Sequence, residues 1–291
     1  MVTRIISGIV GVAVALAIIL FGGVPGLTVA VALLAGLATF ELLRAAGFGA
    51  RDRIPAVAVA VLTPLSLLVN GTLWMAPTAL YLLYVMVEGV MRHEALPPER
   101  VALKVLLPAV AIGGFSAVAA LRAHGADGLF YLFLVLVIPW LSDTGAYFTG
   151  MCCGKHKLCP VISPKKTVEG FVGGIVVSVA ASALTGVLYT LWCGHDVTVN
   201  WLSLLAAAAV GAPLSVCGDL FASVIKRRFG VKDYGNIMPG HGGAMDRFDS
   251  VLPVAIWLLL KRPGNRIDLV RTSIYGSATV ASSFITPHRP D

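Results

Sequence analysis

Residues 128–149 read GLFYLFLVLVIPWLSDTGAYFT, an apolar stretch with one charged side chain, Asp143. A helix of about 20 apolar residues, rising about 1.5 Å per residue, crosses the roughly 30 Å of hydrocarbon in a bilayer. This stretch is therefore long enough to span a membrane. Because a carboxylate is costly inside a span, Asp143 is a candidate functional residue.

Similar stretches fill most of the chain. Of its 291 residues, 57% are hydrophobic and 13% are charged, whereas about 25% are charged in an ordinary soluble protein. That composition excludes a soluble enzyme, a disordered chain and a nucleic-acid-binding module, so we expect no nucleic-acid partner. The candidate spans are residues 4–21, 25–43, 54–70, 72–91, 101–122, 128–149, 168–192, 201–225 and 248–260.

The sequence therefore predicts an all-α integral membrane protein, a polytopic bundle of about nine transmembrane helices. The count becomes eight if the last segment, which has about half the length of a span, does not cross. Residues 4–21 could instead be a signal peptide, but no small-residue cleavage pattern follows them, so we interpret them as the first span. The five cysteines are too few and too irregularly spaced for a disulfide framework, and we expect them to be reduced.

Basic side chains are concentrated in alternate loops. Sixteen of the 22 Lys and Arg residues precede the first span or follow the second, fourth, sixth and eighth, whereas the opposite loops hold Arg122 alone. By the positive-inside rule, the basic loops face the cytoplasm. We expect an integral membrane protein with its polar site on the cytoplasmic side. Residues 261–291 hold the other five basic residues, and we expect them to form a poorly ordered tail. The side of the membrane on which this tail lies stays open.

Two acidic residues within the spans have a structural interpretation. Glu41 has Arg44 at i+3 and Glu88 has Arg92 at i+4, spacings that suit an ion pair near a helix end. We therefore expect Glu41→Gln to cost little activity.

Other acidic residues occur at the ends of the later spans together with Gly, Lys and His. Asp219, Asp246 and Asp249 offer the hard oxygen ligands that Mg²⁺ prefers, and the i, i+3 spacing of the last two places both on one face of a helix. Positive charge for phosphate oxygens comes from Lys165, Lys166, Lys226 and Arg227. The glycines within 239–243 allow backbone N–H groups to approach an anion.

Each of these features has a structural explanation when taken alone, since packed acids, basic loops and glycine turns are common. Their combination at one membrane face predicts metal-assisted phosphate chemistry. Zinc is the alternative metal, because Cys152, Cys153, His156 and Cys159 lie close together in sequence. Their spacing does not match the paired C-x-x-C pattern, so we do not expect a zinc site.

The order and spacing of these motifs resemble those of the phosphatidate cytidylyltransferase (CDP-diacylglycerol synthase) family. The resemblance covers about 110 residues and rests on SDTGAY at 142–147, SPKKT at 163–167, SVIKR at 223–227, KD at 232–233, PGHGG at 239–243 and DRFDS at 246–250. Residues 1–130 match only as apolar spans. The cysteines at 152–153, where an aromatic residue is more usual, and the long polar tail depart from the family pattern.

The resemblance implies that the phosphate of phosphatidate attacks the α-phosphorus of CTP, giving CDP-diacylglycerol and pyrophosphate. It implies Mg²⁺, with or without a second cation, at Asp219 and Asp246, with Asp249 as a further ligand and Asp143 as a fourth catalytic carboxylate. The substrate-binding residues that it implies are Ser163, Lys165, Lys166, Thr167, Lys226, Arg227, Lys232, Gly240, His241, Gly242, Gly243 and Arg247. It also implies a homodimer in the bacterial inner membrane.

On this interpretation residues 1–130 form a scaffold of helices with possible dimer contacts, 131–260 the catalytic membrane region and 261–291 the polar tail. Two alternatives stay open. One is a cytidylyltransferase for another lipid phosphate, such as an archaeal ether lipid, because the motifs concern CTP and metal and not acyl chains. The other is a transporter of phosphorylated solutes, which is disfavoured because transporters place their charged residues near the midplane of repeated halves.

The loop charges predict the side of the membrane that residues 150–167 and 226–249 face. A cysteine that replaces Lys157 in a cysteine-free background should be protected from a membrane-impermeant thiol reagent added to intact cells, and should react after the cells are opened. Labelling from outside the intact cell would contradict this orientation.

Overall fold

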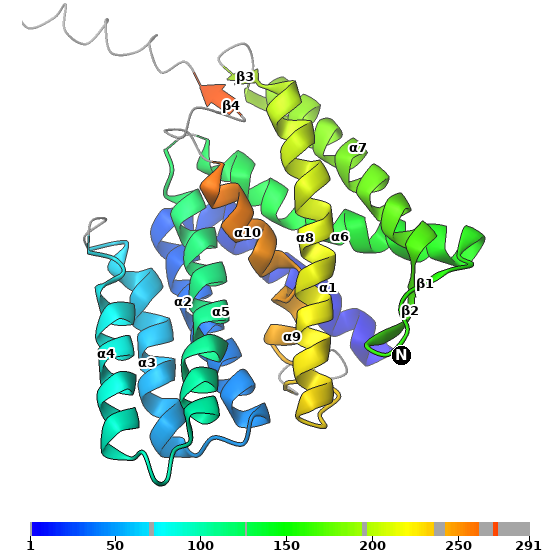
Figure 1. The fold of residues 1–291 in the computed structure, drawn as a ribbon. Helices are drawn as coiled ribbons and strands as arrows, with labels where there is room; N and C mark the ends of the chain where they lie inside the picture. Colours follow the sequence, from blue (N-terminus) through cyan, green and yellow to red (C-terminus); the bar gives the residue numbers. More distant parts are fainter. Residues whose placement is uncertain are drawn as a thin grey trace, which may run out of the picture.

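The structure is a computed structural model that describes residues 2–69, 73–125, 127–193, 197–235, 242–261 and 270–272. Each of the nine predicted spans corresponds to a helix (Figure 1). These helices are α1 (Val2–Phe21), α2 (Gly23–Ala45), α3 (Ala50–Ser66), α4 (Ala76–Met91), α5 (Pro98–Arg122), α6 (Gly128–Cys153), α7 (Val168–Cys193), α8 (Trp201–Arg228) and α10 (Val251–Leu260). The prediction of an all-α polytopic membrane protein is confirmed.

The described helices differ in their ability to cross a bilayer. Among them, α2, α5, α6, α7 and α8 are long and apolar enough to span a membrane, whereas α4 and α10 are shorter apolar helices. The last apolar segment is thus a helix of ten residues. It follows α9 (Met245–Phe248), a single turn inside the predicted DRFDS motif.

The short helix α10 joins the two halves of the bundle. It packs against α5 on one side and against α8 and α6 on the other (Figure 1). Its side chains Leu252, Ala255 and Leu258 are almost completely buried. Gly114 of α5 permits this close approach, because a Cβ atom there would collide with the side chain of Leu252.

Helices α6 and α7 form the most extensive helix pair in the chain. Small residues bring their backbones together, as is common in membrane helix pairs. A Cβ atom added at Gly170 or at Gly174 would lie 2.7 Å from a carbonyl oxygen of α6, that of Ala146 or of Ser142. The hydroxyl of Ser178 also donates a hydrogen bond of 3.0 Å to the carbonyl oxygen of Ile138.

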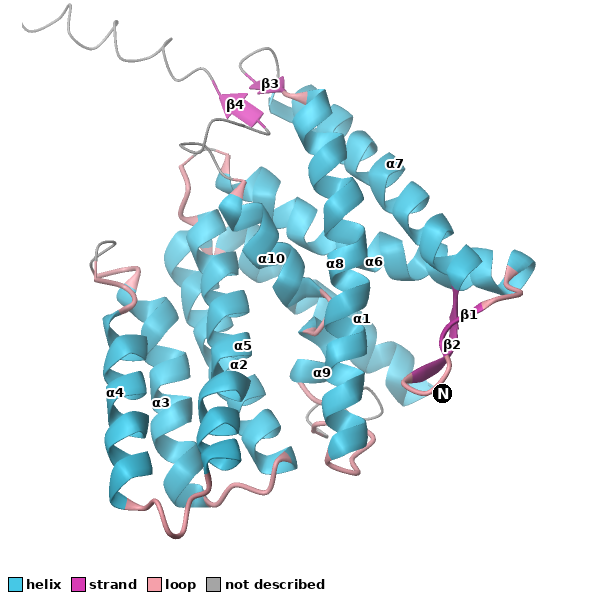
Figure 2. Ribbon diagram, in the orientation of Figure 1, coloured by secondary structure: helices cyan, strands magenta, loops and turns pink. Residues whose placement is uncertain are grey.

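Two small antiparallel pairs of strands, which the sequence did not predict, lie at opposite ends of α7 (Figure 2). Strands β1 (Lys157–Cys159) and β2 (Ser163–Thr167) form a hairpin that connects α6 to α7. Strand β3 (Val197–Val199), between α7 and α8, pairs with β4 (Val270–Thr272). Residues 270–272 of the tail thus belong to a strand pair, while 262–269 and 273–291 lie outside the described residues, and the poorly ordered tail stays a prediction.

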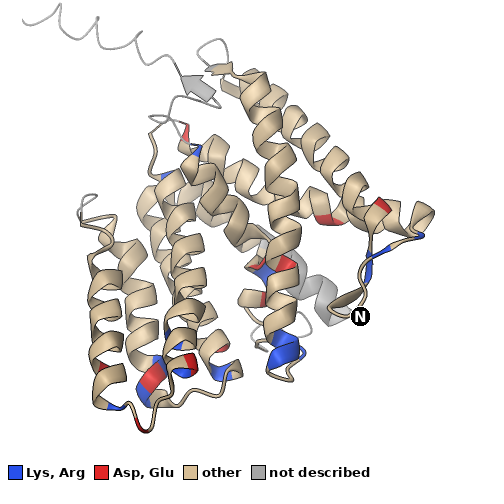
Figure 3. Ribbon diagram, viewed as in Figure 1, with Lys and Arg blue, Asp and Glu red and all other residues tan. Residues whose placement is uncertain are grey.

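Charged residues gather at the ends of α3, α4, α5 and α8, and others lie on the hairpin (Figure 3). One cluster there is buried. The predicted pair of Glu88 and Arg92 is confirmed, with 2.6 Å between carboxylate and guanidinium. The ammonium group of Lys104, which is 0% exposed, also contacts Glu88 and lies 2.9 Å from a carboxylate oxygen of Asp52. These four side chains connect α3, α4 and α5.

Replacing Lys104 by Met should destabilise the protein, because Asp52 and Glu88 would lose the cation between them. Breaking a buried ion pair from one side costs about 3–5 kcal/mol. Thermal unfolding in detergent, followed by intrinsic fluorescence, should show a lower midpoint for Lys104→Met. Adding Glu88→Gln to that variant should recover part of the loss, and an unchanged midpoint in the single variant would contradict the role of this cluster.

Candidate active site

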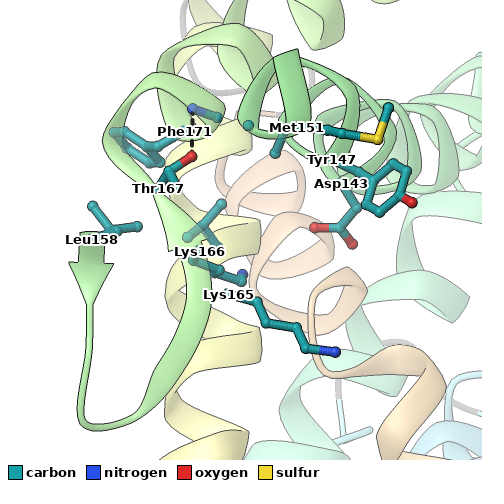
Figure 4. Close-up of a pocket in the computed structure, with 12 residues that line it drawn as sticks. Asp143, Tyr147, Met151, Leu158, Lys165, Lys166, Thr167 and Phe171 are labelled. Carbon is teal, nitrogen blue, oxygen red and sulfur yellow. Dashed lines mark hydrogen bonds between the residues drawn. The ribbon is translucent and has the colours of Figure 1, made fainter. Parts of the chain in front are cut away.

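A cavity of about 320 Å³ lies between α6, α7 and the hairpin (Figure 4). Asp143 points into it from α6, and Lys165 and Lys166 reach it from β2. The rest of the lining is largely apolar and includes Tyr147, Met151, Leu158, Phe171 and Val216. The cavity therefore offers charged groups to one part of a ligand and an apolar surface to another.

An ion pair connects the hairpin to α8. The ammonium nitrogen of Lys166 lies 2.6 Å from a carboxylate oxygen of Asp219, and both side chains are partly exposed. Asp143 interacts electrostatically with both partners. Three residues that the sequence predicted from separate motifs are therefore brought together here.

A second group of predicted residues surrounds the carboxylate of Asp246, at the start of α9. One oxygen lies 2.9 Å from the ammonium nitrogen of Lys226 on α8. The other accepts hydrogen bonds from the backbone N–H of Tyr234, at 2.7 Å, and of Gly243, at 3.0 Å. Gly242 has a positive φ of 83°, a backbone conformation that glycine adopts at no steric cost. Gly242 and Gly243, the described part of the predicted glycine turn, thus lie against Asp246.

Asp249 lies between α9 and α10 and is buried. It is close enough to Asp219 and to Asp246 to interact electrostatically with each of them. The close packing depends on Gly218 of α8, where a Cβ atom would collide with the carbonyl oxygen of Asp249.

The sequence predicted the wrong partner for Glu41. Its carboxylate does not pair with Arg44; it accepts hydrogen bonds from the backbone N–H groups of Ala244, at 3.1 Å, and Met245, at 2.9 Å. Arg44 instead donates a hydrogen bond of 2.7 Å to the carbonyl oxygen of Tyr234. Sequence spacing favoured the local pair because the true partners lie about 200 residues away. The signal that the sequence did hold was an acidic residue in the last turns of an apolar helix.

Other predicted residues have varied positions. Thr167 lines the cavity, and its hydroxyl also accepts a hydrogen bond from Gly170 N–H at the start of α7. Ser163 lies at the first residue of β2, outside the described lining of the cavity. Exposed positions are those of Arg227, Lys232 and Arg247. Gly240 and His241 lie outside the described residues.

Comparison with known proteins assigns the chain to a family. Residues 2–261 match the sequence model of the Cytidylyltransferase family. The chain belongs to this family.

Curated relatives in the family carry a more specific name. The chain is 44% identical over 142 residues to a phosphatidate cytidylyltransferase from Staphylococcus haemolyticus, an alignment that covers 48% of this chain and 52% of the relative. It is 46% identical over 138 residues to phosphatidate cytidylyltransferases from Staphylococcus saprophyticus and Staphylococcus aureus, over 46% of this chain and 51% of each relative. The chain thus spans about half the length of these curated relatives.

The side chains around Asp219 and Asp246 fit a magnesium ion in their chemistry. The donors are carboxylate oxygens, and magnesium usually takes one or two of them and completes its shell with water and substrate phosphates. Within the described residues no three His, Cys, Asp or Glu side chains converge on one point, so such an ion would depend on ligands from outside the protein. Asp219 pairs with Lys166 and Asp246 with Lys226, and Asp249 interacts electrostatically with both carboxylates.

The residues that were considered as zinc ligands, Cys152, Cys153, His156 and Cys159, have other contacts or are exposed. His156 Nδ1 lies 2.6 Å from a carboxylate oxygen of Glu169, which also accepts hydrogen bonds from the backbone N–H of Lys155 and His156. The five cysteines form no disulfide, and Cys152 and Cys153 are exposed.

Replacing Cys152, Cys153 and Cys159 together by Ser should change neither the bound zinc nor the stability of the protein. Zinc content by elemental analysis and the midpoint of thermal unfolding should match those of the unaltered chain. Loss of one equivalent of zinc together with a lower midpoint would show that the cysteines form a metal site.

Proposed function

We propose that this chain is a phosphatidate cytidylyltransferase, which joins the cytidylyl group of CTP to phosphatidate and releases pyrophosphate. The observation that carries the proposal is the cavity with Asp143, Lys165 and Lys166 beside an apolar lining. Such a cavity suits a ligand that has a phosphate and an apolar chain. Membership of the Cytidylyltransferase family and the name of the curated relatives support the same reaction.

The apolar part of the lining is placed to meet lipid. Tyr147 and Met151 lie on α6, a helix able to span the membrane, and are 66% and 63% exposed. In a bilayer, such side chains face acyl chains as readily as a ligand. A lipid phosphate can then keep its chains in the hydrocarbon while its head group reaches the lysines of β2.

In the proposed reaction, a phosphate oxygen of phosphatidate forms a bond to the α-phosphorus of CTP. The bond from that phosphorus to the bridging oxygen of the β-phosphate breaks, and pyrophosphate leaves with the electron pair. A phosphate monoester has its second pKa at about 6, so the attacking oxygen is already anionic near neutral pH. No strong general base is required, and positioning and charge neutralisation provide the catalysis.

The lysines would bind the phosphate groups. Lys165 and Lys166 would hold the lipid phosphate at the cavity, and Lys226 the triphosphate beside Asp246. Asp219 and Asp246 would provide carboxylate ligands for Mg²⁺, with Asp249 nearby and with water and substrate phosphates completing the shell. The positive charge of the ion would neutralise the negative charge that develops on the triphosphate. Asp143 would orient the lysine ammonium groups. The predicted cytoplasmic side gives access to CTP, and a homodimer is the proposed assembly.

The test of this function is incubation of the purified protein with CTP, Mg²⁺ and a panel of lipid phosphates that includes phosphatidate and an ether-linked analogue. Pyrophosphate should appear only when a lipid phosphate is present, and CDP-diacylglycerol should form with phosphatidate. Faster reaction with the ether lipid would assign a different acceptor. Pyrophosphate release without lipid, or none with any lipid, would contradict the proposal.

Asp246→Asn and Asp219→Asn test the proposed carboxylates. Each keeps the size of the side chain and removes the charge that would balance the metal, so the rate of CTP turnover should fall about a hundredfold or more. Glu94→Gln, a matched change at an exposed position, should leave the rate unchanged. Near-normal turnover by folded, membrane-inserted Asp246→Asn and Asp219→Asn would show that the metal assignment is wrong.

A further inference from the structure

We propose that Glu41 and Arg44 of α2 form a clamp that positions the turn carrying Asp246, and that Glu41 is the positioning residue on which this turn depends. The inference rests on the proposed function for the reaction that the turn serves. It assigns a role in the site to a helix of the first half of the chain, where the motifs do not reach.

The clamp holds the chain on both sides of residues 236–241. Before this segment, Arg44 donates its hydrogen bond to the carbonyl oxygen of Tyr234. After it, the carboxylate of Glu41 accepts one hydrogen bond on each oxygen from Ala244 and Met245. Asp246 accepts hydrogen bonds from the N–H groups of Tyr234 and Gly243. Asp246 and the clamp therefore bind the same two stretches of chain from different sides.

The fit around the Glu41 carboxylate is close. Glu41 is 1% exposed. A Cβ atom added at Gly235 or at Gly243 would collide with its carboxylate oxygens. These two glycines thus leave the space that Glu41 fills, one from each side of the segment. A buried carboxylate with backbone N–H donors on both oxygens is costly to displace, because its charge would lose those partners.

The position of Asp246 follows from this arrangement. Met245, which donates to Glu41, precedes Asp246 directly, and Lys226 reaches Asp246 from α8. If the turn shifts, the carboxylate of Asp246 moves relative to Lys226. A misplacement of about 1 Å can cost about a hundredfold in rate. On this proposal we expect Glu41→Gln to lower the activity, in contrast to the expectation from the sequence alone.

The test compares Glu41→Gln with Glu88→Gln, a matched change at a buried glutamate of α4 whose partners are the side chains of Arg92 and Lys104. In Glu41→Gln, the amide NH₂ replaces one acceptor and faces a backbone N–H group. Hydrogen exchange, measured by mass spectrometry on a peptide that covers 243–249, should become at least tenfold faster. The kcat for CTP should fall at least tenfold, and the half-saturating Mg²⁺ concentration should rise.

Glu88→Gln should instead lower the unfolding midpoint and leave exchange at 243–249 and the Mg²⁺ dependence unchanged. If Glu41→Gln does not fold, Gly235→Ala provides the second variant, since it displaces the carboxylate and keeps its charge; it should give the same faster exchange and lower kcat. Exchange and kcat equal to those of the unaltered chain, in whichever variant folds, would overturn the clamp. Failure of the unaltered chain to use CTP would contradict the proposed function, whereas the exchange measurement would still decide the clamp.

Discussion

The structure depends on the cost of placing a carboxylate in an apolar bundle. A buried charge needs a partner or a set of hydrogen bonds, and each acidic residue of the bundle meets that need in its own way. Glu88 has Lys104 and Arg92, Asp246 has Lys226 and two backbone N–H groups, and Glu41 has backbone N–H groups alone. The same requirement fixes the packing of α3 to α5 and the shape of the candidate site.

The sequence was sufficient to predict those features that depend on residues close together in the chain. Apolar length predicted all nine long or short apolar helices, because each segment of hydrocarbon-compatible residues must satisfy its backbone hydrogen bonds internally. The i, i+4 spacing predicted the pair of Glu88 and Arg92 for a similar reason. Local patterns could not reveal Lys104, which reaches Glu88 from the next helix. The strands were missed because β1 and β2 are short polar segments and β3 pairs with a segment about 70 residues later.

In the candidate site, too, the sequence predicted individual residues but not the contacts between distant parts of the chain. The motifs identified Lys166, Asp219, Lys226 and Asp246, but not that the first two form one ion pair and the last two another. Those pairings depend on how α8 passes the hairpin and α9. Glu41 was assigned to Arg44 because they are close in sequence, whereas its donors come from the far end of the chain. Binding of Mg²⁺ and the roles of Gly240 and His241 stay predictions.

The glycines between α6 and α7 also bear on how the cavity could admit a ligand. The atoms that Gly170 and Gly174 face are backbone oxygens of α6, which cannot rotate aside as a side chain can. Sliding α6 along α7 by one residue would place side chains where only glycine fits. The close backbone contact therefore opposes sliding of the two helices, whereas the hairpin on the other side of the cavity is joined to α8 by an ion pair between partly exposed side chains.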